Sequence, residues 1–212
     1  VKAEWVKPGV LIKDRAALLM ILDGINSKKL DSKKIIMDSS SGNTAISYAM
    51  IGAALGFKVE LVTPENINIE RKKTLQAYGA KIIYSSALEG SDGAIIEARK
   101  LVKKFPNKYF MPDQYNNPAN PLAHFKTTGP EIWEQTQGKI THLICGIGTS
   151  GTVMGAGAYL KTKNSNIKII GVLMKKVLIT TFLAFGISGL AQAQDNKFAP
   201  LQPEQQMQRN YA

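Results

Sequence analysis

The chain has 212 residues, of which 44% are apolar and 20% charged, and its formal net charge is +11. This is the composition of a globular protein, and it excludes a disordered chain and a protein embedded in a membrane throughout. The lysines are scattered over element ends without interleaved aromatic residues, which indicates a solvated surface rather than a nucleic-acid interface. Cys145 is the only cysteine, which excludes an intramolecular disulfide and a cysteine–histidine metal cluster.

Short β-branched runs alternate with helical patterns from the start of the chain to Val172. A first helix is predicted over residues 14–28. Strands are predicted over residues 34–37, 58–62, 81–84, 109–111, 141–145 and 167–172. Between the strands, helices are predicted over residues 43–55, 66–78, 93–104, 122–135 and 151–161, with Gly56 and Gly79 as left-handed helix ends. This alternation predicts an α/β fold with parallel sheets and flanking helices.

The pattern changes after Val172. Two lysines are followed by an apolar run over residues 177–190, by Ala191-Gln192-Ala193, and by a polar tail to residue 212. The run is shorter than the about 20 apolar residues that a membrane-spanning helix needs. Residues 174–193 therefore resemble a secretory signal peptide in an unexpected place, and a buried hydrophobic helix is the alternative. We interpret residues 173–212 as a signal-like segment and tail, unrelated to the rest, from a fused or misassembled reading frame.

Lys13 lies where a Pro8-Gly9 turn leads into the first helix, which opens at Asp14. A side chain at such a junction can point into a cleft. Lysine forms a Schiff base with an aldehyde once its amine is deprotonated, and desolvation favours that by lowering the amine pKa. Taken alone, Lys13 is one of many lysines, and a surface charge is the simpler interpretation.

Two further segments lie between a predicted strand and a predicted helix. Ser39-Ser40-Ser41-Gly42-Asn43-Thr44 offers hydroxyl and backbone N–H groups for an anion such as an α-carboxylate, although simple helix capping is the alternative. The glycine-rich stretch from Gly146 to Thr152 predicts a phosphate site. It also matches G-x-G-x-x-G, but the acidic residue that a dinucleotide site needs about 20 positions later is absent.

Taken together, these segments resemble the cysteine synthase (O-acetylserine sulfhydrylase) family of fold type II pyridoxal-phosphate (PLP) enzymes, whose fold is tryptophan synthase beta-like. The resemblance extends from Lys2 to Val172. It is carried by the lysine segment Lys7–Arg15, the loop Ser40–Ala45, the loop Gly148–Thr152, and the stretches Pro64–Asn66, Ile69–Arg71, Asp113–Tyr115, Asn117–Pro121 and Thr127–Trp133.

The resemblance implies PLP as cofactor and a role for each matching residue. Lys13 is the catalytic residue, forming the Schiff base with PLP and moving the substrate α-proton. Asn43 binds the ring hydroxyl oxygen of PLP. The PLP phosphate is held by Gly148, Thr149, Ser150, Gly151 and Thr152, and the substrate α-carboxylate by Ser40, Ser41, Thr44 and Gln114.

The implied reaction is β-replacement in cysteine biosynthesis, in which an activated serine and a sulfide donor give L-cysteine. O-acetylserine and O-phosphoserine both remain possible acceptors. Serine or threonine dehydratase and cystathionine β-synthase are alternatives of the same fold, and a truncated, catalytically impaired fragment is the third. The resemblance also implies a homodimer and a cytoplasmic enzyme, with no metal and no nucleic-acid partner, and the signal-like segment conflicts with the cytoplasmic location.

Within this fold we predict a smaller, substrate-gripping lobe over residues 33–126. Residues 1–32 and 127–172 are predicted to form a larger PLP-binding lobe that is incomplete, and no residue is assigned to the hydroxyl group that faces the pyridine nitrogen in the family. Lys7 and Ala45 depart from the family pattern. Cys145 is interpreted as a buried, inert thiol, the histidines His124 and His142 as surface or capping groups, and Trp5 and Trp133 as packing residues.

Overall fold

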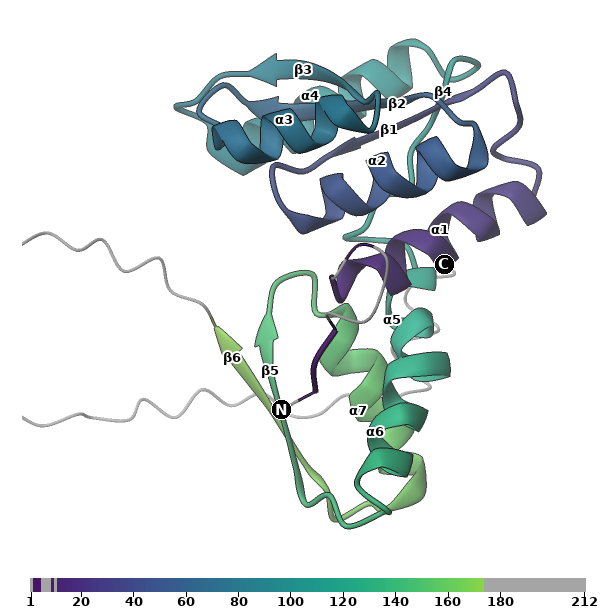
Figure 1. The fold of residues 1–212 in the computed structure, drawn as a ribbon, viewed down its shortest axis with the longest axis vertical. Coiled ribbons are helices and arrows are strands. Elements are labelled where there is room, and N and C mark those ends of the chain that lie inside the picture. The colour runs from purple at the N-terminus through teal and green to yellow at the C-terminus, as the bar shows by residue number, and fades with distance from the viewer. Residues whose placement is uncertain (1, 5–8, 10, 174–212) are drawn as a thin grey trace, which may run out of the picture. The chain divides into compact units, whose positions relative to one another are not determined.

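The computed structural model describes residues 2–4, 9 and 11–173, and helices alternate with parallel strands in the predicted order (Figure 1). The predictions for Trp5, Lys7, residue 8 and residues 174–212 lie outside the described residues. The strands are β1 (Ile35–Ser39), β2 (Val59–Pro64), β3 (Lys81–Ser85), β4 (Tyr109–Phe110), β5 (His142–Ile147) and β6 (Lys168–Leu173). The helices are α1 (Lys13–Asn26), α2 (Asn43–Leu55), α3 (Ile69–Ala77), α4 (Gly90–Lys104), α5 (Ala119–Ala123), η1 (His124–Thr128), α6 (Gly129–Gln135) and α7 (Gly151–Lys163).

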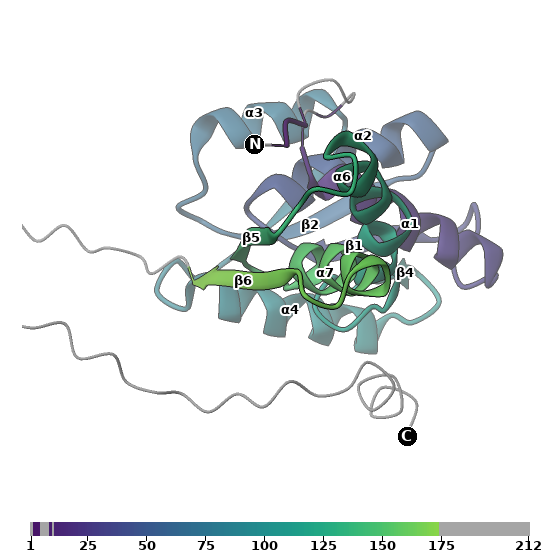
Figure 2. The same cartoon turned by 90° about the horizontal axis from the view of Figure 1, so that it is seen from below.

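The first sheet is parallel, with strand order β3-β2-β1-β4, and helices cover both of its faces. Side chains alternate between the faces of a strand. Accordingly, Ile36 and Leu61 pack with α1, α2 and α3, whereas Met37 and Val62 pack with α4. Figure 2 shows α2 and α3 on one side of these strands and α4 on the other. The prediction of a parallel sheet with flanking helices is confirmed.

The second sheet pairs β5 with β6 in parallel, with Leu143 opposite Ile169 and Ile144 opposite Ile170. Leu143 and Ile169 belong to a core cluster with residues of α6 and α7, including Trp133 as predicted. Ile144 and Ile170 project from the opposite face and are 63% and 40% exposed. Among the described residues, this sheet therefore has one well-packed face.

Residues 119–135 form three consecutive helical pieces: α5, the π-helical turn η1, and α6. The sequence predicts one helix over residues 122–135. Pro130 lies in the first turn of α6 and has no N–H to donate to the carbonyl of Lys126, so the α-helical ladder is interrupted there. The prediction of a single uninterrupted helix was therefore wrong. A π-turn widens the helix locally and often lies at functional sites.

Other local predictions hold. Gly56 and Gly79 both have φ of +76°, the left-handed conformation that a helix end without a Cβ adopts readily. None of the helices within residues 11–173 is both long enough and apolar enough to cross a membrane. Residues Val1–Leu173 form one compact unit, and the division into two lobes stays a prediction.

Candidate active site

Most of the residues that the sequence predicts for the site line one cavity of about 470 Å³ at the carboxyl ends of β1 and β2. The cavity is bordered by the start of α1, the loop between β1 and α2, the start of α4, and the loop after β5. It is lined by Ile12, Lys13, Ser39, Ser40, Ser41, Gly42, Asn43, Thr44, Pro64, Arg71, Ser91, Ala94, Ile95, Gln114, Tyr115, Gly148 and Thr149. Chain segments that are far apart in the sequence thus meet at one site.

Lys13 is the first residue of α1, at the predicted junction between loop and helix. Its Nζ donates a hydrogen bond to Thr149 Oγ1 at 3.1 Å, and the part of the chain that the structure describes offers no carboxylate partner in an ion pair with it. Burial lowers the pKa of the Lys13 amine below its ordinary value. The structure therefore favours the neutral, nucleophilic amine more than a surface position would.

The loop between β1 and α2 presents its polar groups to the same cavity. The N-cap of α2 is Gly42, which makes no side-chain capping bond, so the simple helix-capping interpretation is not supported. Thr44 donates to Gln114 Oε1 at 2.8 Å, and Gln114 donates to the carbonyl of Ser39 at 3.4 Å. Gln114 thereby fixes both sides of the loop while the helix N-terminus stays open to an anion.

The glycine-rich loop after β5 is only partly in the cavity. Gly148 and Thr149 line it, whereas Ser150, Gly151 and Thr152 do not. Ser150 has φ of +63° at the N-cap of α7, and a Cβ added at Gly151 would meet the Asn120 side chain. The loop therefore turns sharply between its cavity-lining part and its helix-starting part.

Asn120, in the stretch Asn117–Pro121 that resembles the family, joins two parts of the site. Its Nδ2 donates to the carbonyl of Gln114 at 2.8 Å and to Thr149 Oγ1 at 2.9 Å. Thr149 Oγ1 thus accepts hydrogen bonds from both Lys13 and Asn120. The hydroxyl proton of Thr149 is therefore free to be donated to a third group, such as an anionic oxygen.

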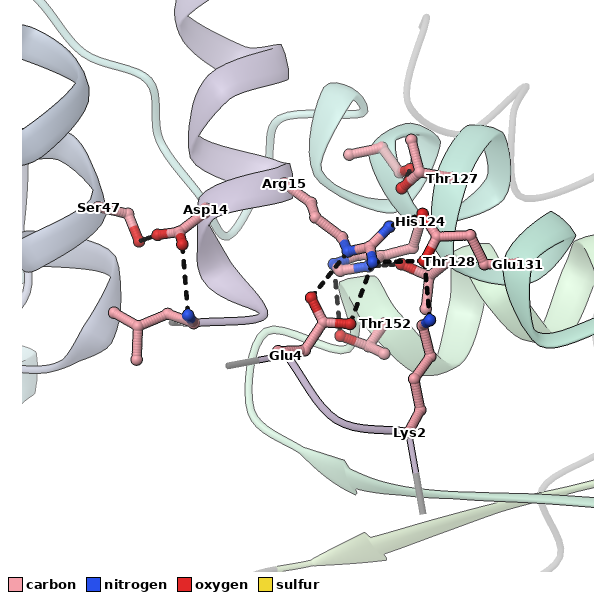
Figure 3. Close-up of polar contacts among 12 residues, drawn as sticks. Lys2, Glu4, Asp14, Arg15, Ser47, His124, Thr127, Thr128, Glu131 and Thr152 are labelled. Atoms are coloured by element: carbon pink, nitrogen blue, oxygen red, sulfur yellow. Dashed lines mark hydrogen bonds and ion pairs between the residues drawn. The ribbon is translucent and has the colours of Figure 1, made fainter. Parts of the chain in front are cut away.

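His124 is fully buried, so its interpretation as a surface or capping group was wrong. Its Nδ1 lies 2.9 Å from Thr128 Oγ1, and its Nε2 lies 3.3 Å from Thr152 Oγ1 (Figure 3). Burial, followed by the charges of Lys13 and Arg15, lowers the His124 pKa to about 4. The neutral ring therefore connects η1 with the start of α7 and with the glycine-rich loop.

Arg15 anchors the residues around Lys13. It is 8% exposed, and it bonds Glu4 Oε2 at 3.0 Å and Glu131 Oε2 at 2.6 Å (Figure 3). The hydrogen bond from Arg15 holds the Glu131 pKa at about 2, and Lys2 contributes a second contact at 2.7 Å. This cluster ties the segment before α1 and the helix α6 to the first turn of α1.

Asp38, at the end of β1, is a second buried group that sequence patterns did not single out. It is 1% exposed; one oxygen accepts from the Ser39 N–H at 2.8 Å, and Oδ2 has no partner among the described residues. Burial raises the Asp38 pKa to about 7. Of the other titratable groups, Cys145 is half-buried rather than buried, and burial raises its pKa; His142 lies on an exposed strand end.

A lysine at a helix start, facing an open helix N-terminus and a glycine-rich loop in an α/β fold, defines a site for an anionic, aldehyde-bearing cofactor. The family model described as pyridoxal-phosphate dependent enzyme matches residues 1–186, and the chain belongs to that family.

Three relatives illustrate the similarity. The chain is 54% identical over 171 residues to a cysteine synthase of Aquifex aeolicus, covering 81% of this chain and 52% of the relative. Among solved structures, cysteine synthase of Entamoeba histolytica has a TM-score of 0.72 at 38% identity, with 76% of this chain and 47% of that chain covered. An O-acetylserine dependent cystathionine beta-synthase of Helicobacter pylori has a TM-score of 0.76 at 34% identity, with 81% and 56% covered. The chain spans about half the length of the curated relatives it matches.

Proposed function

We propose that this chain carries the PLP- and substrate-binding half of a β-replacement enzyme that forms L-cysteine from an activated serine and a sulfide donor. The observation that carries the proposal is that Lys13, the Ser40–Thr44 loop, Gln114 and the loop at Gly148 and Thr149 all line one cavity.

The donor set fits PLP. Lys13 has a lowered pKa and contacts Thr149, so it is placed to bond the cofactor's aldehyde carbon close to a phosphate-binding hydroxyl. Gly148 and Thr149 would hold the phosphate, with Ser150, Gly151 and Thr152 forming the rest of that loop, and Asn43 would bind the ring hydroxyl oxygen. When bound, PLP supplies the electron sink for negative charge at the substrate α-carbon.

The chain's own residues would then act on the amino acid. Ser40, Ser41, Thr44 and Gln114 would hold its α-carboxylate through hydroxyl, amide and helix N-terminal groups. Lys13 would take the proton from the α-carbon, because its amine is the basic group of the cavity that burial favours in neutral form. The acceptor would be O-acetylserine or O-phosphoserine.

Cystathionine formation is the second candidate, and the Helicobacter pylori relative favours it, because its fold matches this chain with a TM-score of 0.76. Both candidates need the same Lys13 chemistry and differ in the thiol that adds to the substrate. Supplying sulfide or homocysteine to the same preparation separates them by product.

A homodimer in the cytoplasm is part of the same proposal. A second cavity between α1 and α2 is lined mostly by apolar side chains, with charged groups such as Asp14 and Lys126 beside them, and Leu18, Leu22 and Leu55 in it are 43%, 37% and 45% exposed. An apolar surface of this kind suits burial against another copy. The proposed lobes remain residues 33–126 and residues 1–32 with 127–172.

The experiment that tests the function is reduction of the PLP-treated protein with borohydride, followed by peptide mass spectrometry. We expect the stable adduct on Lys13. Lys33 and Lys34, in the loop between α1 and β1, should remain unmodified and serve as internal controls. An adduct on another lysine, with Lys13 unmodified, contradicts the proposal.

A further inference from the structure

Asp14 follows Lys13 directly, yet the two side chains serve different surroundings. Adjacent residues of a helix do not face each other. Lys13 lines the candidate active site, whereas Asp14 lines the cavity between α1 and α2. Asp14 is therefore not the counter-ion of the Lys13 amine, which donates its hydrogen bond to Thr149.

The Asp14 carboxylate is buried, 8% exposed, and accepts a hydrogen bond on each oxygen. Ser47 Oγ donates to Oδ1 at 2.7 Å, and the Leu11 N–H donates to Oδ2 at 3.3 Å (Figure 3). A Cβ added at Gly9 would collide with this carboxylate. The carboxylate thus packs against the loop before Lys13 and bonds a side chain of α2.

Ser47 lies one turn after Asn43 on α2, and its Oγ is 3.0 Å from the Asn43 carbonyl oxygen. The shorter contact of Ser47 is to Asp14, and hydrogen bonds to a charged acceptor are the stronger kind. A continuous path therefore leads from the backbone of Leu11 through Asp14 and Ser47 to the first turn of α2.

We infer that Asp14 is a positioning residue, which with Ser47 sets the spacing between the Lys13 amine and the Asn43 side chain. This inference rests on the proposed function, because those two groups are the ones assigned to neighbouring positions of the PLP ring. The helix α1 has no side-chain capping bond at its start, and this carboxylate joins its first turn to α2, whereas Arg15 joins the same turn to Glu4 and to α6.

The test uses the full chain with Asp14→Asn, Ser47→Ala and the double variant. Asp23→Asn, an exposed carboxylate on the same helix, is the matched control. Circular dichroism first establishes that each variant is folded. The cofactor dissociation constant is then measured together with the absorbance of the Lys13 Schiff base. Each single variant is expected to weaken cofactor binding by up to roughly tenfold, if the loss of this hydrogen bond to a charged group is expressed in the position of Lys13 and Asn43.

Because both substitutions break the same link, the double variant is expected to lose no more than the stronger single one. Unchanged binding and absorbance in folded Ser47→Ala and Asp14→Asn proteins overturn the inference, and so do losses that add.

A second readout needs no cofactor. The Lys13 amine is labelled with acetic anhydride over a pH series, and mass spectrometry compares Lys13 with the other lysines. Ser47→Ala should move the Lys13 labelling midpoint upward, because a loosened first turn exposes the amine to water. If the unsubstituted chain forms no Schiff base, the proposed function fails, and this labelling alone decides the inference: an unmoved midpoint rejects it.

Discussion

At the scale of single residues, the proposed binding of the amino acid and the proposed binding of the cofactor depend on different atoms of Gln114. Its amide bonds Thr44 and the Ser39 carbonyl, which lie on the two sides of the loop between β1 and α2. The glycine-rich loop is reached only through the Gln114 backbone carbonyl, by way of Asn120. Removing the Gln114 side chain therefore disturbs the loop that we propose binds the substrate carboxylate, and it leaves the connection to Thr149 in place.

Gln114→Ala is accordingly expected to weaken the spectral response to O-acetylserine more than it weakens PLP retention. Asn43→Ala, which removes the contact proposed for the PLP ring hydroxyl, is expected to weaken both. Each lost hydrogen bond to a charged group costs about 1.5–3 kcal/mol, which is more than tenfold in affinity. Spectral titration of the PLP-loaded proteins measures the response, with the exposed Gln76→Ala as control. An unaltered titration in both variants would contradict the assignment of this loop to substrate binding.

His124 makes the stability of the fold depend on pH. Its pKa is lowered to about 4 by burial and then by Lys13 and Arg15, so the folded state resists protonation while the unfolded state accepts it at the ordinary value of 6.5. The contribution is complete above the unfolded value and is lost as the pH falls towards the folded one. Between about pH 7 and about pH 5 the loss amounts to about 2 kcal/mol.

His124→Gln is therefore expected to lose less stability than the unsubstituted chain over this acidification. Urea unfolding at both pH values measures the difference. Asp38, whose pKa is raised to about 7 by burial, acts in the opposite direction, since its stability is complete below the ordinary value and is lost as the pH rises. Because Asp38 is present in both proteins, the comparison removes its effect; parallel pH profiles would exclude the role of His124.

The residues of the site that local patterns predict are those that lie between a strand and a helix. Ser40, Asn43 and Thr149 are examples, because a glycine or hydroxyl cluster at that position has a direct chemical meaning, whereas Lys13 was found from its place at a helix start. Asn120, His124 and Asp38 were missed since their importance comes from burial by distant segments. Asn120, for example, meets Thr149 only after segments 29 positions apart in the chain have packed together.

At the scale of elements, the contact of α7 with α5 and η1 places the glycine-rich loop. Gly155 of α7 lies so close that an added Cβ would meet the Pro121 carbonyl oxygen, and it would be 2.8 Å from His124 Cβ. These neighbours are backbone or stiff groups. The helices can therefore approach this closely only with glycine at that position.

Gly155→Ala is expected to destabilise the protein, because overpacking costs about 1–3 kcal/mol, while the gain in helix propensity returns about 0.5–1 kcal/mol. Thermal or urea unfolding measures the net loss. Gly146→Ala is the control, since an added Cβ there meets nothing within 4 Å. Equal stabilities of the two variants would show that α7 shifts without cost.

The hydrophobic period and the turn residues of the sequence predicted the order and type of the helices and strands. They did not predict how these elements pack. Gly56 and Gly79 marked helix ends correctly because their left-handed conformation is a local requirement. The division of residues 119–135 into α5, η1 and α6 depends on Pro130 and on contacts with α7, so the apolar pattern over 122–135 suggested one helix. The partition of strands into two sheets is likewise a property of the assembled fold.

At the scale of the whole molecule, the two sheets of the described chain differ in how well their faces are covered. Both faces of the first sheet are covered, and every residue of β2 is buried. In the second sheet Ile144, Ile170 and Val172 are 63%, 40% and 45% exposed on one face. Parallel sheets are normally covered on both faces, because their strands are apolar throughout. An exposed apolar face of this kind favours association with other chains.

The 212-residue chain, produced by itself, is therefore expected to have low soluble yield and weak or absent β-replacement activity. Replacing Ile144 and Ile170 with Thr removes apolar surface from the exposed face and retains β-branched side chains, so soluble yield should rise while PLP binding is unchanged. Soluble protein is quantified first, and cysteine formation is then assayed with PLP, O-acetylserine and sulfide. The expectation would be contradicted if the unsubstituted chain formed cysteine at the rate of a full-length relative and Lys13→Ala abolished this activity. Such a result would mean that the exposed face is compatible with an ordered site.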